Sequence, residues 1–131
     1  MSAHDAIVLP FATSTPAMAR TRLASFLTLN LVAPEVIDDA LLVISEMIAN
    51  AVNHGGPTPD GGIEISWTIQ GDLLELSVLD HGAGGSLTPI DFDEDSLSGR
   101  GLSIISQVAD RWWVDMSHGT RVNAELHTTP R

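Results

Sequence analysis

Apolar and polar residues alternate with a period of two in several segments of the chain, which predicts half-buried β-strands there. These segments are residues 63–69, 74–80, 112–116 and 122–126. Gly71-Asp72 is expected to join the first two as a tight hairpin turn, and residues 117–120 to turn the chain between the last two. The short apolar run 6–11 contains Pro10, so we expect an edge strand, because proline cannot donate a hydrogen bond within a sheet.

A helical period replaces this alternation in residues 17–31, 34–54 and 99–110. Ser14 or Thr15 is available to cap the first helix. Pro34 begins the second helix, where acidic residues in the first turns are favoured by the helix dipole. Gly55 and the residues after it end that helix.

The order of predicted elements is strand, two helices, hairpin, long loop, helix, hairpin. Hairpins on either side of a helix predict an α+β fold, a two-layer α/β sandwich with a mixed, mostly antiparallel sheet and helices on one face. With 131 residues and no internal repeat, we expect a single domain, residues 1–131. The glycine-rich and acidic segment 82–98 shows little periodicity, and we expect it to form a mobile lid.

Polar residues form a narrow strip on the otherwise apolar second helix. Glu46, Asn50 and Asn53 are spaced at i, i+4 and i+7, with His54 at the edge of the strip. A carboxylate and two amides buried without partners would cost several kcal/mol. The strip is therefore expected to face a cavity that holds water, metal or ligand, or else to meet solvent along one side of a core helix.

Composition narrows the classes of function. The chain has no cysteine, and its six basic residues are all arginine against 17 acidic ones, giving a formal net charge of −11. The absence of lysine excludes Schiff-base chemistry and the P-loop lysine. The acidic balance disfavours nucleic-acid binding, because it repels phosphates, and favours a basic protein partner.

The sequence gives no sign of a membrane segment or a secretion signal. No apolar run reaches the roughly 18 residues of a membrane span, and the first residues lack a basic region followed by a long apolar one. A cysteine-free chain also suits a reducing compartment. We therefore expect a soluble, cytoplasmic protein.

Two further segments have the features of an anion or nucleotide site. Asp80 ends a predicted strand and is followed by Gly82 and Gly84, which permit sharp turns and a close approach of the backbone to a ligand. Gly99-Arg100-Gly101 begins a predicted helix, with Ser98 as its cap, and free N–H groups at a helix start bind anions. With no lysine, a bound polyphosphate would depend on backbone amides, a metal such as Mg²⁺ and Arg100 for positive charge.

Taken together, the order SEMIANAVNHGG, VLDHGAGG, SGRGLSIISQVADRW and GT resembles the GHKL (HATPase) family of ATP-binding domains, which includes histidine kinases and gyrase. Within that family, the small size and these motifs are similar to the stand-alone anti-sigma-factor serine/threonine-protein kinases. The resemblance covers nearly the whole chain, from about Pro16 onward.

The resemblance implies a role for individual residues. Glu46 matches the general base and Asn50 the asparagine that binds Mg²⁺, while Asp80 matches the aspartate that accepts a hydrogen bond from the adenine amino group, with Thr120 beside it. The remaining residues implied to contact ATP are Asn53, His54, Gly82, Gly84, Ser98, Gly99, Arg100, Gly101 and Leu102.

The implied function is that of an ATP- and Mg²⁺-dependent kinase that phosphorylates a STAS-type anti-sigma antagonist and sequesters a sigma factor. A nucleotide-gated binding module without phosphotransfer and a simple ATPase are alternatives that retain the same binding residues. Whether two copies form a homodimer is left open. A zinc hydrolase built from His54, Asp80 and His81 is disfavoured, because the five histidines show neither H-x-H nor H-E-x-x-H spacing.

Overall fold

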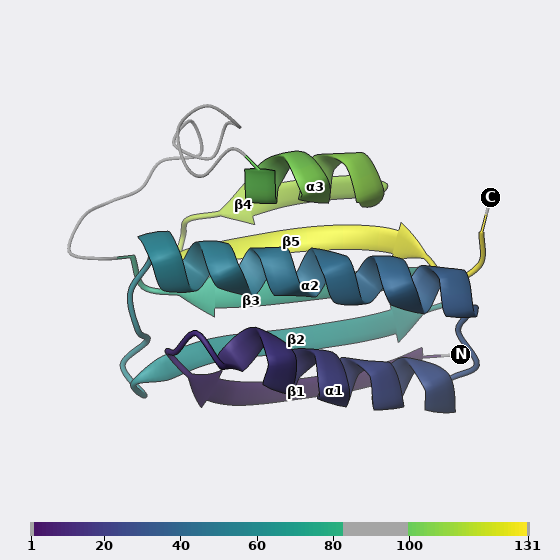
Figure 1. Ribbon diagram of the computed structural model, residues 1–131, viewed down its shortest axis with the longest axis horizontal. Helices are drawn as coiled ribbons and strands as arrows, with labels where there is room; N and C mark the ends of the chain where they lie inside the picture. Colours follow the sequence, from purple (N-terminus) through teal and green to yellow (C-terminus); the bar gives the residue numbers. More distant parts are fainter. Residues whose placement is uncertain (1, 83–99, 131) are drawn as a thin grey trace.

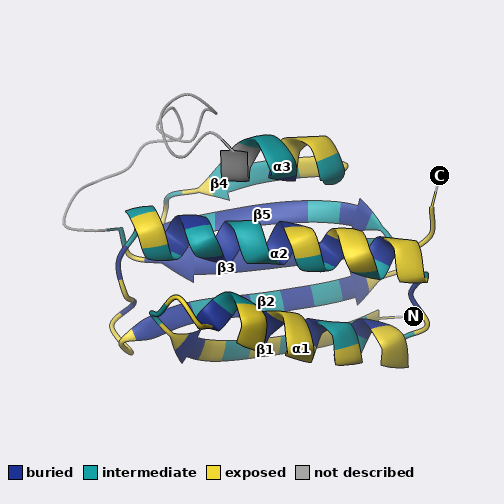
Figure 2. Ribbon diagram, in the orientation of Figure 1, coloured by how far each residue is buried: buried dark blue, intermediate teal, exposed yellow. Residues whose placement is uncertain are grey.

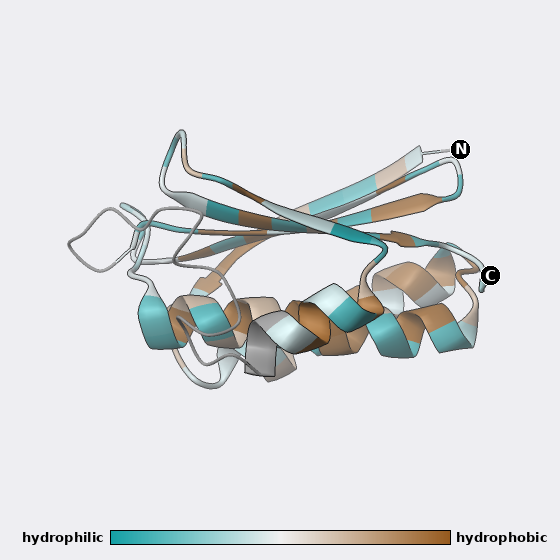
Figure 3. Ribbon diagram, turned by 90° about the horizontal axis from the view of Figure 1, so that it is seen from above, coloured by the Kyte–Doolittle hydropathy of each residue, from teal (hydrophilic) through white to brown (hydrophobic). Residues whose placement is uncertain are grey.

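In the computed structural model, which describes residues 2–82 and 100–130, five strands and three helices form two layers (Figure 1). The strands are β1 (Ser2–Pro10), β2 (Gly62–Gln70), β3 (Leu73–Asp80), β4 (Arg111–Asp115) and β5 (Thr120–His127). The helices are α1 (Thr15–Leu29), α2 (Pro34–His54) and α3 (Arg100–Val108). The predicted α+β sandwich is confirmed, with all three helices on one side of the sheet (Figure 3).

The sheet has the strand order β1-β2-β3-β5-β4, and every neighbouring pair among the described strands is antiparallel. The sheet is thus antiparallel throughout these strands rather than mixed. β3 and β5 lie side by side near its centre, with Asp80 directly opposite Thr120. The predicted hairpin at Gly71-Asp72 is confirmed, since Gln70 pairs with Leu73 across it.

The N-terminal strand is longer than its apolar run predicts. β1 begins at Ser2 rather than at residue 6, because it pairs with the whole of β2, from Ser2 opposite Gln70 to Pro10 opposite Gly62. It is an edge strand, as its proline suggests. α1 also starts earlier than predicted, at Thr15, whose buried hydroxyl donates a hydrogen bond to the Pro10 carbonyl and so ties the helix start to the strand end.

The core lies between the sheet and the inner faces of α1 and α2 (Figure 2). Alternate residues of β2, including Ile63, Ile65 and Trp67, meet Val43, Ile44 and Ile48 of α2 in one buried cluster. The outer face of α2 is exposed at Leu42 and at the acidic residues of its first turns. α2 is therefore fixed against the sheet along most of its length, which sets where its C-terminal residues lie.

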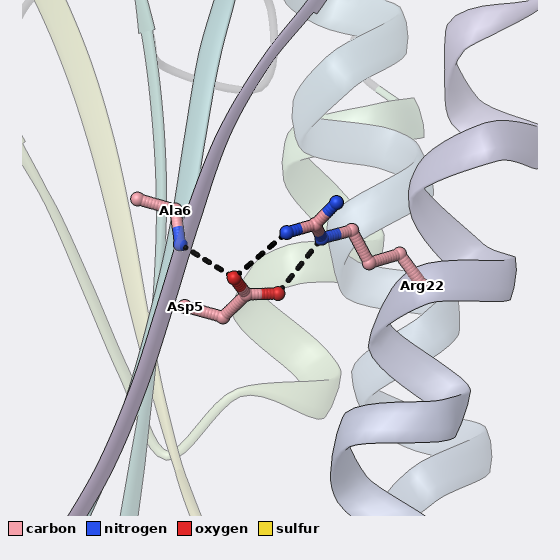
Figure 4. Close-up of polar contacts among 3 residues, drawn as sticks. All are labelled: Asp5, Ala6 and Arg22. Atoms are coloured by element: carbon pink, nitrogen blue, oxygen red, sulfur yellow. Dashed lines mark hydrogen bonds and ion pairs between the residues drawn. The ribbon is translucent and has the colours of Figure 1, made fainter.

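An ion pair joins α1 to the edge strand (Figure 4). The Arg22 guanidinium donates from Nε to Asp5 Oδ2 over 2.8 Å and from Nη2 to Asp5 Oδ1 over 2.9 Å, and the Ala6 N–H donates to Oδ1 over 3.0 Å. The hydrogen bond from Arg22 lowers the pKa of Asp5. Asp5 lies on the helix side of β1, and a charged residue placed there disfavours edge-to-edge pairing with other strands.

None of the helices in the part of the chain that the structure describes is both long enough and apolar enough to span a membrane.

Truncation inside the α2 interface tests this packing. Ile48 is 0% exposed, so Ile48→Ala is expected to lower the free energy of unfolding by about 2–5 kcal/mol through lost burial and a cavity. Leu42→Ala, on the same helix but 43% exposed, is the control and should cost about 0.5 kcal/mol. Urea denaturation of both variants measures the difference, and equal losses would contradict the assigned face of α2.

Candidate functional site

Asp80 is a buried carboxylate at the C-terminal end of β3, with 4% of its surface exposed. Two backbone N–H groups donate to its Oδ1, Gly82 over 2.7 Å and Gly56 over 3.3 Å. Burial raises the pKa of Asp80, and these two hydrogen bonds oppose that rise without cancelling it. Asp80 is therefore a carboxylate that is costly to ionise. Its hydrogen-bond partners in the described chain are backbone amides, so a structural ion pair does not explain why its pKa is shifted.

The end of α2 is bonded to the end of β3. Gly55 continues past the helix in an extended conformation, with its N–H donating to the Ala51 carbonyl. Gly56 then donates to Asp80 and accepts a hydrogen bond of 2.9 Å from the His81 N–H. The Gly82 N–H reaches Asp80 because this glycine adopts φ 61°, in the left-handed region that favours glycine. The end of α2 and the turn after β3 therefore converge on one side chain.

A small pocket lies beside Asp80, between the C-terminal turns of α2 and the central strands. Its lining in the described chain is Met47, Asn50, Ala51, His54, Gly55, Val78, Asp80 and Val122. It encloses about 10 Å³, close to the space that one water molecule needs. A purine is far larger, so this pocket alone does not enclose one, and its lining is a mostly apolar floor with one carboxylate at its edge.

The structure brings five of the predicted site residues together. Asn50 and His54 line the pocket with Asp80, and Thr120, 3% exposed, lies opposite Asp80 on β5. Gly82 is in contact with the same carboxylate through its N–H.

The polar strip of α2 is divided rather than facing one cavity. Asn50 is buried, Glu46 is half-buried and does not line the pocket, and Asn53 is exposed. The residues of the helix that line the pocket are Met47, Asn50, Ala51 and His54. This face is rotated from the predicted strip, because the sheet packs against the side of the helix that carries Val43 and Met47. Of the three residues of the predicted strip, Asn50 lines this pocket, and the functional roles of all three stay predictions.

Several of the predicted site residues are not among those that the structure describes. Gly84, Ser98, Gly99 and all but the first residue of the predicted lid 82–98 lie outside the described residues. α3 begins at Arg100, so a helix starts where the sequence predicts an anion-binding segment, at Arg100, Gly101 and Leu102; the side chains of these three residues also lie outside what the structure describes.

The sequence reasoning did not identify the apolar floor or the close neighbours of Asp80. Val78 and Val122 belong to the alternating pattern of β3 and β5 and could have been placed beside Asp80 and Thr120 from that period alone. Gly119 was predicted only as a turn residue and as part of the GT motif, with no contact assigned to it. Its φ is 88°, and a Cβ there would lie 2.6 Å from the Asp80 carbonyl oxygen. No local pattern reveals such a contact, since it depends on the pairing of distant strands.

The donor set suits a magnesium ion that is bound together with phosphates. Within residues 2–82 and 100–130, no group of three His, Asp or Glu side chains is arranged to hold a metal ion. Mg²⁺ commonly takes one or two protein oxygens and completes its shell with phosphates and water. An amide oxygen such as that of Asn50 is a ligand of this kind.

Comparisons with known proteins agree with this geometry. The model of the histidine kinase-like ATPase domain matches residues 10–125. The chain is 29% identical over 108 residues to the anti-sigma F factor of Clostridium acetobutylicum, covering 77% of this chain and 76% of that protein. It also resembles the crystal structure of the RsbU and RsbW domains of Rv1364c from Mycobacterium tuberculosis, with a TM-score of 0.68 and 21% identity. That match covers 95% of this chain but 32% of the longer one, and it shows a shared fold.

The raised pKa of Asp80 predicts how stability depends on pH. Because burial favours the protonated carboxyl in the folded state, the contribution of Asp80 to stability is present at low pH and is lost as the pH rises through its folded-state pKa. Asp80→Asn resembles the protonated form, so its free energy of unfolding should exceed that of the wild type at pH 7.

That difference should shrink as the pH falls toward about 3.9, the ordinary pKa of an aspartate. Urea denaturation at a series of pH values measures it, with Asp60→Asn, which removes a carboxylate from an exposed loop position, as the control. A wild type more stable than Asp80→Asn at pH 7 would contradict the assigned role of burial.

Proposed function

Because the chain belongs to the histidine kinase-like ATPase domain family, we propose that it binds ATP with Mg²⁺ and transfers the γ-phosphoryl group to a serine or threonine hydroxyl of a partner protein. The observation that carries the proposal is the buried Asp80 carboxylate, held by the N–H groups of Gly56 and Gly82 at the rim of an apolar floor. Such a group accepts a hydrogen bond from a flat, largely apolar ligand that bears an amino group, as adenine does.

The adenine base rests on the apolar floor in this proposal. Met47, Ala51, Val78 and Val122 supply apolar contact, which is typical of pockets that orient a ligand with few polar groups. Asp80 supplies the acceptor for the exocyclic amino group. Thr120, buried opposite Asp80, offers a hydroxyl as donor or acceptor to the same edge of the base.

The phosphates extend from the base toward the start of α3. The first N–H groups of a helix have no partner within it, and they bind anions together with the positive end of the dipole. Gly99, Arg100, Gly101 and Leu102 fall at that point of the chain. Asn50 holds Mg²⁺ through its amide oxygen in this proposal, and the ion when bound neutralises charge on the phosphates.

Glu46 is the proposed general base. It lies one turn before Asn50 on α2 and is half-buried, so it is accessible to a partner that docks on this part of the helix. Its carboxylate accepts the hydroxyl proton of the partner as that oxygen bonds to the γ-phosphorus. The bond between the γ-phosphorus and the bridging oxygen breaks, and ADP leaves with that oxygen.

The proposed partners follow from the net charge of the chain and from its similarity to a known protein. One relative is named an anti-sigma F factor. We accordingly propose a role in transcription regulation, with a sigma factor and an anti-sigma antagonist as partners. A net charge of −11 attracts a basic partner surface, and a newly phosphorylated partner is repelled by the same charge, which promotes its release.

A nucleotide-gated binding module that transfers nothing is the second candidate. The position of Glu46 favours it, since this side chain does not line the pocket that Asn50 and Asp80 share. Such a module needs the acceptor at Asp80 and the phosphate-binding segment but no general base. Its binding of a partner depends on nucleotide binding alone.

Phosphotransfer by the wild type separates the two candidates, and removal of Glu46 tests the proposed general base. Glu46→Gln is expected to leave ATP affinity within about twofold and to lower phosphotransfer by about 10²–10⁴-fold, the usual contribution of a general base. The measurement is single-turnover transfer from radiolabelled ATP to the protein recovered with this chain from its host. Glu35→Gln, exposed in the first turn of α2, is the control; an unaltered rate in Glu46→Gln would remove Glu46 from the mechanism.

Removal of Asp80 tests the nucleotide site itself. Asp80→Ala deletes a charged hydrogen-bond acceptor and should weaken ATP binding by roughly 10- to 100-fold. Isothermal titration calorimetry with ATP and MgCl₂ gives the dissociation constants, and Asp38→Ala, at an exposed position of α2, should match the wild type. Flat heats for the wild-type protein would rule out the proposed function.

A further inference from the structure

We infer that Gly55 and Gly56 are positioning residues that decide which oxygen of Asp80 faces the nucleotide base, and so make the site select a hydrogen-bond donor on the ligand. The inference rests on the proposed function, because it concerns how the same site distinguishes one purine from another.

Both hydrogen bonds from the backbone fall on a single oxygen of the carboxylate. The Gly56 and Gly82 N–H groups donate to Oδ1, over 3.3 and 2.7 Å, and no described residue donates to Oδ2. These donors come from the two chain segments on either side of Asp80, the end of α2 and the turn after β3. Oδ1 is thus occupied by the protein, and Oδ2 is the acceptor that remains for a ligand in the adjoining pocket.

Gly55 holds the carboxylate in this orientation by leaving room for it. A Cβ at position 55 would lie 2.3 Å from Asp80 Oδ1 and 2.5 Å from Asp80 Cγ, well inside van der Waals contact, and 2.7 Å from the Ala51 carbonyl oxygen. The φ of Gly55 is −103°, which any residue adopts, so the close approach of Asp80 and of the Ala51 carbonyl oxygen, and not the backbone conformation, requires glycine here. A methyl group would push the carboxylate away from the Gly56 N–H.

This arrangement fixes the orientation of an amide placed at the same position. In Asp80→Asn the two backbone N–H groups require the oxygen of the side chain at the Oδ1 position, because an NH₂ group there would face two donors. The NH₂ group then takes the Oδ2 position and points a donor at the ligand. The site should therefore select a carbonyl oxygen on the base where the wild type selects an amino group.

ATP and inosine triphosphate form a matched pair of probes. They share ribose, phosphates and magnesium, and they differ at purine position 6, which bears an amino donor in ATP and a carbonyl acceptor in inosine triphosphate. Affinities of the full chain for both, measured by titration calorimetry with MgCl₂, give a ratio that cancels any general change in stability or in phosphate binding.

We expect the wild type to bind ATP at least about tenfold more tightly than inosine triphosphate, and Asp80→Asn to reverse that preference. Gly55→Ala, which displaces the carboxylate, should bring the ratio near one. Gly61→Ala is the control, since Gly61 has a φ of 81° but no atom within 4 Å of an added Cβ, and it should keep the wild-type ratio.

Two results would overturn the inference while the proposed function stands: a folded Gly55→Ala with the wild-type ratio, or an Asp80→Asn that still prefers ATP. A merely structural effect weakens both nucleotides by the same factor and leaves the ratio unaltered, which also counts against it. If Gly55→Ala does not fold, Asp80→Asn decides alone. A wild type that binds neither nucleotide overturns the proposed function itself.

Discussion

The arrangement of the site depends on the hydrogen bonds that one buried carboxylate receives. Asp80 sits at the end of a central strand with almost no contact with water, and a charge in that place is tolerated only where hydrogen bonds replace its hydration. The bonds come from Gly56, after α2, and Gly82, after β3. Because burial still outweighs them and raises the pKa of Asp80, the group weakens the fold it belongs to, which is typical of functional residues.

The antiparallel sheet explains why this carboxylate can sit there. β3 lies between β2 and β5, so the side chains of β3 on the helix side are buried. The pairing of β3 with β5 places Thr120 opposite Asp80 and Val122 opposite Val78. The same register supplies the polar rim and the apolar floor of the pocket. α2 completes the site because its long apolar face fixes it on the sheet, so that its last turn ends beside the strand ends.

Local patterns in the sequence were enough to predict most of the elements and the two-layer fold, because these follow from side-chain period and helix signals. They failed where long-range contacts decide. The length of β1 depends on its pairing with β2, and the pocket face of α2 depends on which side the sheet covers, so Ala51 faces the pocket and Asn53 faces solvent. The role of Gly55 follows from a contact between residues 25 positions apart, which spacing does not reveal.

The electrostatics of the site also favour one direction for a bound nucleotide. The pocket beside Asp80 lies at the C-terminus of α2, where the helix dipole is negative, and Asp80 adds a carboxylate to the same place. A phosphate there would meet repulsion from both, whereas a neutral base with an amino group gains a hydrogen bond. α3 packs against α2 and begins at Arg100, so a helix with its positive end near that residue is available for the phosphates (Figure 1). In the proposed function of this lysine-free chain, this separation of negative and positive helix ends is what would let an acidic protein bind an acidic ligand.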